Sequence, residues 1–317
     1  MENLTGKTAF ITGSASGIGL GIAKACGNAG MNVVIADVRR SAIDEALPFF
    51  KERNWPAHGI ELDVTDRKAY ARAADEAETI FGKIHVLINN AGVEVPFGPL
   101  WKSSFNDCDY IVGVNIFGVL NGIQTILPRI IAHGEGGHVV STASMAGLLT
   151  VPGAALYSAT KHAVVGMMES LAAELAETNV GASAFCPGPV PTNITPSSVE
   201  VRPEALRDAT PSQEPRVRRE PPEGLDMTPT QGFLQDPEVI GERVVRGIRR
   251  GDIYILTHKD FIKGVESRCN AVIRAFPDEP FNEARYAVMR QTGSPIYIPI
   301  FDSQTTPGAP DWDISYK

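Results

Sequence analysis

The sequence has only four cysteines and no apolar run long enough to cross a membrane. The cysteines lie far apart and form no C-x-x-C pair, which argues against a disulfide framework and favours a reducing compartment. No apolar run approaches the ~20 residues of a membrane span, and residues 1–10 lack the apolar core of a signal peptide. We therefore expect a cytoplasmic protein without a membrane partner.

The sequence also lacks an excess of positive charge, and it lacks histidine pairs with the spacing of metal ligands. The formal net charge is −8, so neither nucleic acid nor an anionic surface is an expected partner. The six histidines are scattered, and no pair of them has the spacing of metal ligands, so we expect no metal site. A small-molecule substrate remains as the expected partner.

Short apolar runs alternate with helical patterns along most of the chain. Strands are expected at 8–12, 31–37, 57–63, 85–90, 137–144, 180–187 and 252–258. Helices are expected near 18–29, 66–81, 103–132, 157–178 and 237–250. Because apolar strands separated by helices form parallel sheets covered on both faces, we predict an α/β fold. The prediction is a Rossmann-type doubly wound sheet of about seven strands, in one domain spanning 1–317.

Two proline-rich parts interrupt this pattern. Residues 187–237 contain eleven of the 23 prolines. Since this stretch begins at the carboxyl end of a strand, we predict a substrate lid over 193–236 rather than a disordered segment. A C-terminal extension, 280–317, ends in a tail whose aromatic residues predict docking on the body or on another subunit, with simple fraying as the alternative. These aromatic residues are Tyr297, Phe301, Trp312 and Tyr316.

A glycine-rich stretch, T-G-S-A-S-G-I-G, follows the first strand. Gly13, Gly17 and Gly19 permit a tight turn and a close approach of the main chain to a pyrophosphate at a helix N-terminus. Alone, the stretch could be a turn with a packing glycine. With a strand before it, a helix after it and Asp37 ending the second strand, it predicts a dinucleotide site.

The acid at Asp37 bears on which dinucleotide binds. A carboxylate there can accept both hydroxyls of the adenosine ribose and repels a 2′-phosphate, which favours NAD over NADP. Arg39 and Arg40 follow closely and could weaken that preference, and a plain turn acid is the alternative reading of Asp37. Asp63, at the end of the third strand, could bond an adenine amino group. The N-N-A-G run at 89–92 offers small residues beside the cofactor, although its amides could instead tie strands together.

A serine, a tyrosine and a lysine predict proton transfer. On a helix, Tyr157 and Lys161 lie one turn apart, and an ammonium there lowers a tyrosine pKa from its usual ~10. Such a tyrosine can exchange a proton with an alcohol or ketone, and Ser144 can orient the substrate oxygen. Asn115, within an apolar helix, needs polar partners, which a water in a proton relay or the nearby backbone could supply. A Y-x-x-x-K pair alone is weak evidence.

Taken together, these motifs resemble the short-chain dehydrogenase/reductases over about residues 5–192. The matching elements are T-G-S-A-S-G-I-G, Asp63, N-N-A-G, Asn115, Ser144, Y-S-A-T-K (157–161) and P-G-P-V-P-T (187–192). More narrowly, I-A-D-V-R, residues 66–78 and a late I-Y-I-L-T-H strand are similar to bacterial Cα-dehydrogenases of lignin β-aryl ether catabolism. Those relatives oxidise a benzylic secondary alcohol with NAD. The chain departs from them in its 195–235 insert and long tail, the parts expected to select the substrate.

The resemblance implies a role for each matching residue. Tyr157 would be the general acid/base and Ser144 would hold the substrate oxygen. Lys161 would lower the tyrosine pKa and bind the nicotinamide ribose, and Asn115 would hold the water of a proton relay. The cofactor-binding residues are expected to be Gly13, Ser16, Gly17, Ile18, Gly19, Asp37, Val38, Asp63, Val64, Asn90, Ala91, Gly92, Tyr157, Lys161, Pro187, Gly188, Val190 and Thr192.

The expected substrate contacts are mostly apolar, which predicts a hydrophobic substrate and leaves an aromatic one open. They are Val93, Val95, Ser144, Met145, Leu149, Tyr157 and Pro189. The resemblance further implies a homodimer or homotetramer built on the helices carrying Asn115 and Tyr157.

We therefore predict an NAD(H)-dependent oxidoreductase (EC 1.1.1.-) that interconverts a secondary alcohol and a ketone. A biosynthetic ketoreductase would use the same residues in the reductive direction. A non-catalytic dinucleotide sensor is the alternative from another class, and such a protein would be expected to lack Tyr157 or Lys161.

Overall fold

The computed structural model describes residues 1–209, 228–230, 232–292 and 299–307. Within these residues, one seven-stranded parallel sheet has the order β3-β2-β1-β4-β5-β6-β7, which confirms the predicted fold. Its strands are β1 (Thr8–Thr12), β2 (Asn32–Asp37), β3 (Ala57–Glu61), β4 (Val86–Asn89), β5 (Gly137–Thr142), β6 (Val180–Cys186) and β7 (Tyr254–Leu256).

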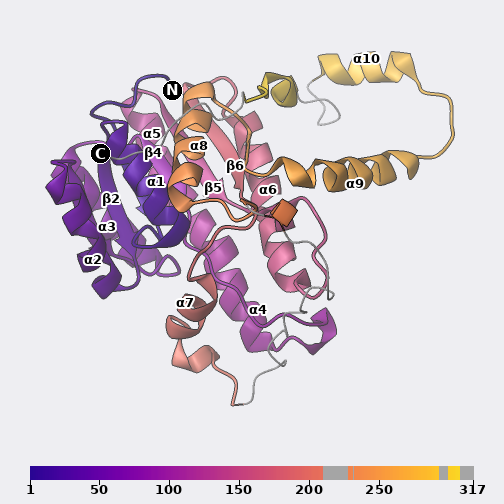
Figure 1. The fold of residues 1–317 in the computed structure, drawn as a ribbon. Helices are drawn as coiled ribbons and strands as arrows, with labels where there is room; N and C mark the ends of the chain where they lie inside the picture. Colours follow the sequence, from indigo (N-terminus) through magenta and orange to yellow (C-terminus); the bar gives the residue numbers. More distant parts are fainter. Residues whose placement is uncertain (210–227, 231, 293–298, 308–317) are drawn as a thin grey trace.

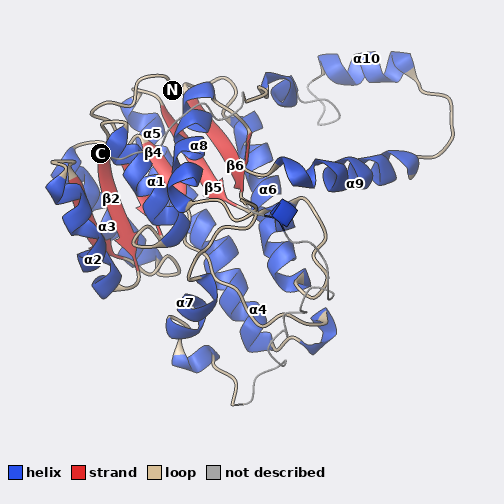
Figure 2. Ribbon diagram, viewed as in Figure 1, coloured by secondary structure: helices blue, strands red, loops and turns tan. Residues whose placement is uncertain are grey.

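Helices cover both faces of the sheet (Figure 2). On one face, α1, α2 and α8 enclose a buried cluster, and on the other face α3, α5 and α6 enclose a second one. The helices are α1 (Gly17–Asn28), α2 (Arg40–Glu52), α3 (Arg67–Phe81), α4 (Phe105–Val112), α5 (Gly118–His133), α6 (Ala155–Glu174), α7 (Ile194–Glu200), α8 (Pro237–Arg250), α9 (Ile262–Arg274) and α10 (Glu283–Gln291).

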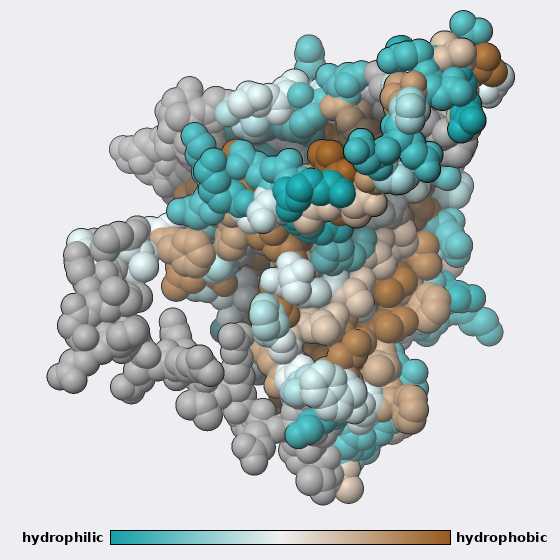
Figure 3. Space-filling model, turned by 90° about the vertical axis from the view of Figure 1, so that its right-hand side faces the viewer, coloured by the Kyte–Doolittle hydropathy of each residue, from teal (hydrophilic) through white to brown (hydrophobic). Residues whose placement is uncertain are grey.

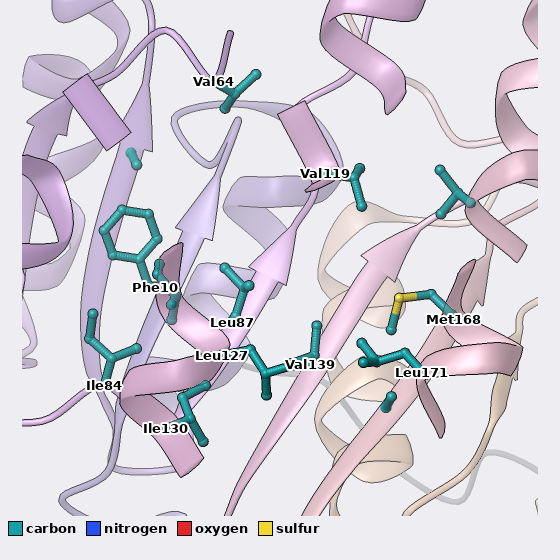
Figure 4. Close-up of a cluster of buried hydrophobic side chains, with 14 of the residues drawn as sticks. Phe10, Val64, Ile84, Leu87, Val119, Leu127, Ile130, Val139, Met168 and Leu171 are labelled. Atoms are coloured by element: carbon teal, nitrogen blue, oxygen red, sulfur yellow. The ribbon is translucent and has the colours of Figure 1, made fainter. Parts of the chain in front are cut away.

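The strands are apolar on both sides because both sides are buried. All five residues of β1 are buried, as are all six of β5. Phe10, Leu87 and Val139 come from neighbouring strands and pack under α5 and α6 (Figure 4). Full burial of each such side chain contributes about 1.5–3 kcal/mol, so this layer holds the strand ends in fixed register.

The order of the strands creates the crevice in which a ligand can bind. The chain moves outward from β1 to β2 and β3, then returns to add β4 on the other side of β1. At such a switch point the loops after β1 and β4 diverge, and α/β folds bind ligands in the space outside these carboxyl ends.

A π-helical turn divides the single helix predicted over 103–132. The turn spans Gly113–Phe117, between α4 and α5, and contains Asn115. Insertions of this kind occur frequently at functional sites. By length and composition alone, the continuous run Phe105–His133 is long and apolar enough to cross a membrane, contrary to the expectation from the sequence. Half of its most apolar window is buried inside the fold, and core helices of soluble proteins pass the same test.

The first part of the predicted lid is folded onto α4. Helix α7 opens this part, and Arg202 beyond it forms an ion pair of 2.7 Å with the buried carboxylate of Asp107. The side chains of Ser104 and Asn106 donate hydrogen bonds to Asp208 at 2.6 and 2.8 Å. Residues 194–208 therefore lie against the body, whereas 210–227 of the predicted lid fall outside the described residues.

The C-terminal part begins with α9 and α10, which project from the body (Figure 1). Further on, the ring of Phe301 stacks on Tyr254 of β7 with ring centroids 6.3 Å apart. The side chain of Gln304 accepts from the Tyr254 N–H at 2.8 Å and donates to its carbonyl at 3.4 Å. This stretch of the extension thus docks on the body, while Tyr297, Trp312 and Tyr316 lie outside the described residues.

Candidate active site

The glycine loop after β1 forms the floor of the site. Gly13 and Gly17 have φ of +61° and +54°, a backbone conformation that favours glycine. A Cβ on Gly13 would lie 2.7 Å from the Ala91 Cα, so the loops after β1 and β4 meet there. Within the described chain, α1 has neither a side-chain cap on Ser16 nor an acid in its first turn. The start of α1 therefore presents main-chain N–H groups suited to a pyrophosphate.

A cavity of about 250 Å³ opens beside this loop. Its walls include six of the predicted cofactor residues, which are Gly13, Val38, Asp63, Val64, Ala91 and Gly92. Val201, Pro203 and Leu206, all from the described part of the predicted lid, also line it. These largely apolar walls fit an adenine ring. The carboxylate of Asp63, in the same lining, accepts hydrogen bonds from the main-chain N–H and the hydroxyl of Thr65 at 2.9 and 2.8 Å.

A second cavity, of about 330 Å³, lies on the α1 side of the loop. Gly17 and Thr192 both line it, and a Cβ on Gly17 would lie 3.3 Å from the Thr192 Cγ2. Two segments that are far apart in the sequence, both predicted to bind the cofactor, therefore meet at the start of α1.

Asp37 lies at the end of β2 with 5% of its surface exposed. Its carboxylate accepts hydrogen bonds from the main-chain N–H of Ala15 at 3.2 Å and of Arg39 at 3.1 Å. The Arg39 side chain adds a third contact of 3.3 Å. The carboxylate is thus held beside the glycine loop, where the resemblance predicts the adenosine ribose.

Asn90 was predicted to lie at the cofactor, and the hydrogen bonds of its side chain are directed into the sheet. Its amide donates to the carbonyls of Thr12 and Gly13 at 3.1 and 3.0 Å, and its oxygen accepts from Thr142 at 3.3 Å. Both donors and the acceptor are therefore engaged with the protein. Asn90 ties the ends of β1, β4 and β5 together, which was the alternative reading of the N-N-A-G run.

Ser144 and Tyr157 meet above the end of β5. Ser144 follows β5 and its hydroxyl accepts from the Ala146 N–H at 3.1 Å, which fixes its orientation. Tyr157 lies in the first turn of α6 and shares a hydrogen bond with Ser144. The thirteen-residue spacing therefore brings a strand-end hydroxyl to a helix-borne phenol.

Lys161 lies one turn after Tyr157 and is 4% exposed. Its ammonium donates to the Thr142 carbonyl at 2.9 Å and lies 5.5 Å from the centroid of the Tyr157 ring. Burial lowers the pKa of Lys161 to about 8, because the charged form loses its hydration.

The pKa of Tyr157 shifts in the direction opposite to the predicted one. Burial raises the pKa of Tyr157 to about 12, the hydrogen bond with Ser144 acts against this rise, and the charge of Glu94 adds to it. The prediction considered the ammonium of Lys161 but not the loss of water around the phenol. Loss of hydration by the buried phenolate is the largest of these effects on the pKa of Tyr157.

Asn115 pairs with the loop after β4. Its side chain donates to the Val93 carbonyl at 2.9 Å and accepts from the Val93 N–H at 2.8 Å. The same amide donates to Thr160 of α6 at 3.2 Å. The carboxamide therefore fixes the position of Val93, as the backbone-bonding alternative expected, and its part in a proton relay stays a prediction.

The predicted substrate residues lie on two sides of Tyr157. Val93 and Val95 are buried in a small cluster against which Tyr157 packs. Met145 and Leu149 belong instead to the large core cluster on the α6 face. Pro189 accepts from the Gln235 N–H through its carbonyl at 3.3 Å. A cavity of about 10 Å³ between Val95 and Tyr157 has room for about one water molecule.

Thr257 and His258, which directly follow β7, hold the start of the P-G-P-V-P-T run in place. The Gly188 N–H donates to the Thr257 hydroxyl at 2.9 Å, and a Cβ on Gly188 would lie 2.4 Å from the His258 ring. Pro187 accepts from the Met145 N–H at 3.0 Å, which links this run to the Ser144 loop.

Three threonines that sequence reasoning missed organise the site. Thr12 accepts from the main-chain N–H groups of Asn90 and Ala91, Thr142 binds Lys161 through its carbonyl, and Thr160 receives the Asn115 amide. Because Thr160 directly precedes Lys161 in the sequence, its place in the site could have been predicted. Thr12 and Thr142 act across the sheet, and local sequence carries no such signal.

Comparison with known proteins agrees with this geometry. A family model described as short chain dehydrogenase matches residues 7–202. A C alpha-dehydrogenase of Sphingobium sp. (strain NBRC 103272 / SYK-6) is 37% identical over 273 residues, covering 86% of this chain and 87% of that protein. A diacetyl reductase, (S)-acetoin forming, of Staphylococcus epidermidis is 35% identical over 188 residues, covering 59% of this chain and 73% of that protein.

Among solved structures, a similar one is a short chain dehydrogenase/reductase from Burkholderia phymatum in complex with NAD. It superposes with a TM-score of 0.76 at 34% identity, covering 89% of this chain and all of that one. The predicted resemblance in sequence thus extends to the fold.

Proposed function

Since the chain belongs to the short-chain dehydrogenase family, we propose that it is an NAD(H)-dependent oxidoreductase that interconverts a secondary alcohol and a ketone. The observation that carries this proposal is the meeting of Ser144, Tyr157 and Lys161 at the end of β5, at the same carboxyl edge of the sheet as two cavities lined by predicted cofactor residues. The names of the Sphingobium and Staphylococcus relatives support alcohol–ketone chemistry.

NAD is the cofactor that we propose. The nearly buried carboxylate of Asp37 supports this choice, because it can accept the ribose hydroxyls and repels a 2′-phosphate. Gly13, Gly17 and the start of α1 would hold the pyrophosphate, and Lys161 the nicotinamide ribose. Bound NAD supplies the hydride acceptor and a positive ring that favours the phenolate form of a nearby tyrosine.

In the oxidative direction, Tyr157 as a phenolate accepts the proton of the substrate hydroxyl. Ser144 donates a hydrogen bond to the substrate oxygen and keeps it within reach of the phenol, which is a contribution of positioning. Lys161, held on the Thr142 carbonyl, provides a positive charge on the same side. In the reductive direction Tyr157 returns the proton to the forming alkoxide.

We further propose a hydrophobic substrate, with aromatic alcohols among the candidates. Val93 and Val95 support this proposal, since Tyr157 packs against the apolar cluster that contains them. Incubation with a panel of aryl and alicyclic secondary alcohols, with NAD and NADP side by side, tests it through the formation of reduced cofactor. If cofactor binds and no alcohol or ketone in the panel is turned over, the proposed substrate class is wrong.

A biosynthetic ketoreductase remains the second candidate, favoured by the similarity to the diacetyl reductase. The same panel, extended to the matching ketones with NADH, separates the two. A higher kcat/KM for ketones at neutral pH would favour the reductive role.

We also propose a homo-oligomer formed through α4, the π turn and α5. Phe105, Phe117 and Ile131 on these elements are 90%, 47% and 47% exposed, so contact with a second copy of the chain would bury apolar surface on all three elements. Hydrophobic residues also gather on the side from which α9 projects (Figure 3). Sedimentation analysis of the wild type and of Phe117→Ser tests the assignment, which a monomeric wild type would contradict.

A further inference from the structure

Arg39 joins the adenosine end of the site to the lid helix. Its Nε donates to the carboxylate of Asp37 at 3.3 Å and its Nη2 to the Ser16 hydroxyl at 2.8 Å. Its Nη1 donates to the hydroxyl of Ser197, on α7, at 3.1 Å. One guanidinium is therefore held by three residues, which lie 2, 23 and 158 positions from Arg39 in the sequence.

The position of Ser197 does not depend on Arg39 alone. Thr195, two residues earlier on α7, donates a hydrogen bond to the Glu94 carboxylate. The hydroxyl of Ser198 accepts from the Glu94 N–H at 3.0 Å, and its carbonyl accepts from the Tyr110 hydroxyl at 2.7 Å. Helix α7 is thus docked on the loop after β4, and it presents Ser197 to Arg39 from a fixed place.

The charges around Arg39 decide whether the 2′-phosphate of NADP can bind beside it. Asp37 repels a 2′-phosphate, and the carboxylate of Glu200, on α7, lies 4.0 Å from the Arg39 Nη1 and adds negative charge at this point. The guanidinium of Arg39 could offset this repulsion. The neighbouring Arg40 is directed away, since it pairs with Asp44 at 2.8 Å on the exposed side of α2. Arg39 can bond a phosphate well only if its N–H groups turn from Asp37 and α7 toward the ligand.

Resting on the proposed function, we propose that Ser197 is a positioning residue for cofactor choice. By holding Arg39 across Asp37, the hydroxyl of Ser197 keeps the guanidinium from turning to a 2′-phosphate. The preference for NAD over NADP then depends on a residue of the lid as well as on Asp37. A residue of the substrate lid would thus take part in selecting the cofactor.

Titration of the full-length protein with NADH and with NADPH, followed by cofactor fluorescence, tests this proposal without any substrate. Ser197→Ala is expected to lower the Kd of NADPH by about three- to tenfold, the size of one ordinary intramolecular hydrogen bond, and to change the Kd of NADH less than about twofold. Thr195→Val is the matched control, because it removes a docking hydroxyl of α7 that does not touch Arg39. It should leave the ratio of the two Kd values unchanged.

A second pair of variants separates this role from a general loosening of the lid. In an Arg39→Met background, Ser197→Ala should no longer alter the ratio, because the guanidinium that it positions is missing. An unchanged ratio in Ser197→Ala, an equal change in Thr195→Val, or the same change in the Arg39→Met background would each overturn the proposal. If the wild type binds neither cofactor, the proposed function itself fails, which is a distinct result.

Discussion

The ammonium of Lys161 donates a hydrogen bond of 2.9 Å to the main-chain carbonyl of Thr142, so α6 is joined to the carboxyl end of β5 by a buried charge. This contact holds Lys161 beside the phenol of Tyr157. It also removes the ammonium from water, which is why burial lowers the pKa of Lys161 to about 8. Four predictions follow from this and other contacts of the site.

The first prediction concerns stability and pH. Between about pH 8 and pH 10.5, the unfolded chain keeps the proton on Lys161 while the folded protein releases it. The unfolded state then binds more protons, so the contribution of Lys161 to the free energy of unfolding rises with pH through this window. Relative to Lys161→Met, the wild type should gain stability between about pH 7 and about pH 9.5, as measured by urea unfolding.

The titration of Tyr157 has the opposite effect and lowers the free energy of unfolding at higher pH. Its pKa is raised to about 12, so above its ordinary value of 10 the folded protein keeps a proton that the unfolded chain loses, and stability falls. The comparison is therefore made below about pH 10. Parallel pH curves for the wild type and Lys161→Met would refute the lowered pKa of Lys161.

The second prediction concerns turnover. Tyr157→Phe removes the hydroxyl that exchanges the proton but keeps the ring in its apolar cluster. Turnover of an alcohol from the panel should fall by about 10²–10⁴-fold, while the Kd of NADH changes little. Near-normal turnover in this variant would exclude Tyr157 as the general acid/base, and unchanged thermal unfolding serves as the control for folding.

The third prediction concerns the glycine loop. A Cβ on Gly19 would lie 2.1 Å from the Gly13 carbonyl oxygen and 2.5 Å from the Asn90 amide. Gly19→Ala should therefore displace the loop and weaken NADH binding by at least about tenfold, the effect of ~1.4 kcal/mol. Gly166→Ala, on the exposed face of α6 with open space around it, is the control and should stabilise the helix by about 0.5–1 kcal/mol. Equal NADH affinities in both variants would contradict this reading.

The fourth prediction concerns the pairing of Asn115 with Val93. Asn115→Ala leaves a buried main-chain N–H and carbonyl without their partner, at a cost of about 1–3 kcal/mol for each group. Thermal and urea unfolding should both show this loss. Asn28→Ala is the control, because Asn28 makes a side-chain hydrogen bond of 3.2 Å on the surface, and its loss should cost less than about 0.5 kcal/mol. Similar losses in both variants would mean that the Val93 pairing adds nothing.

Much of the fold could be predicted because its signals are local. The strand at 31–37 shows its burial in its own composition, and the loop from Gly13 to Gly19 shows the turn that it must make. The helix over 103–132 was predicted as one piece because its apolar residues are nearly continuous. The π turn around Asn115 was not predictable in this way, since the extra residue is accommodated by packing against α6 and the loop after β4.

The sequence by itself determined the family, the doubly wound parallel sheet of a dinucleotide fold and the residue types of the proton-transfer group, because each is encoded in short motifs and in the alternation of strands and helices. Only the tertiary structure decided that Asn90 ties strands together, that burial raises the pKa of Tyr157, and that Arg39 reaches the lid at Ser197. These properties depend on which groups approach one another across the sheet and on how much water they lose. Both are set by contacts between residues far apart in the chain, which no local pattern records.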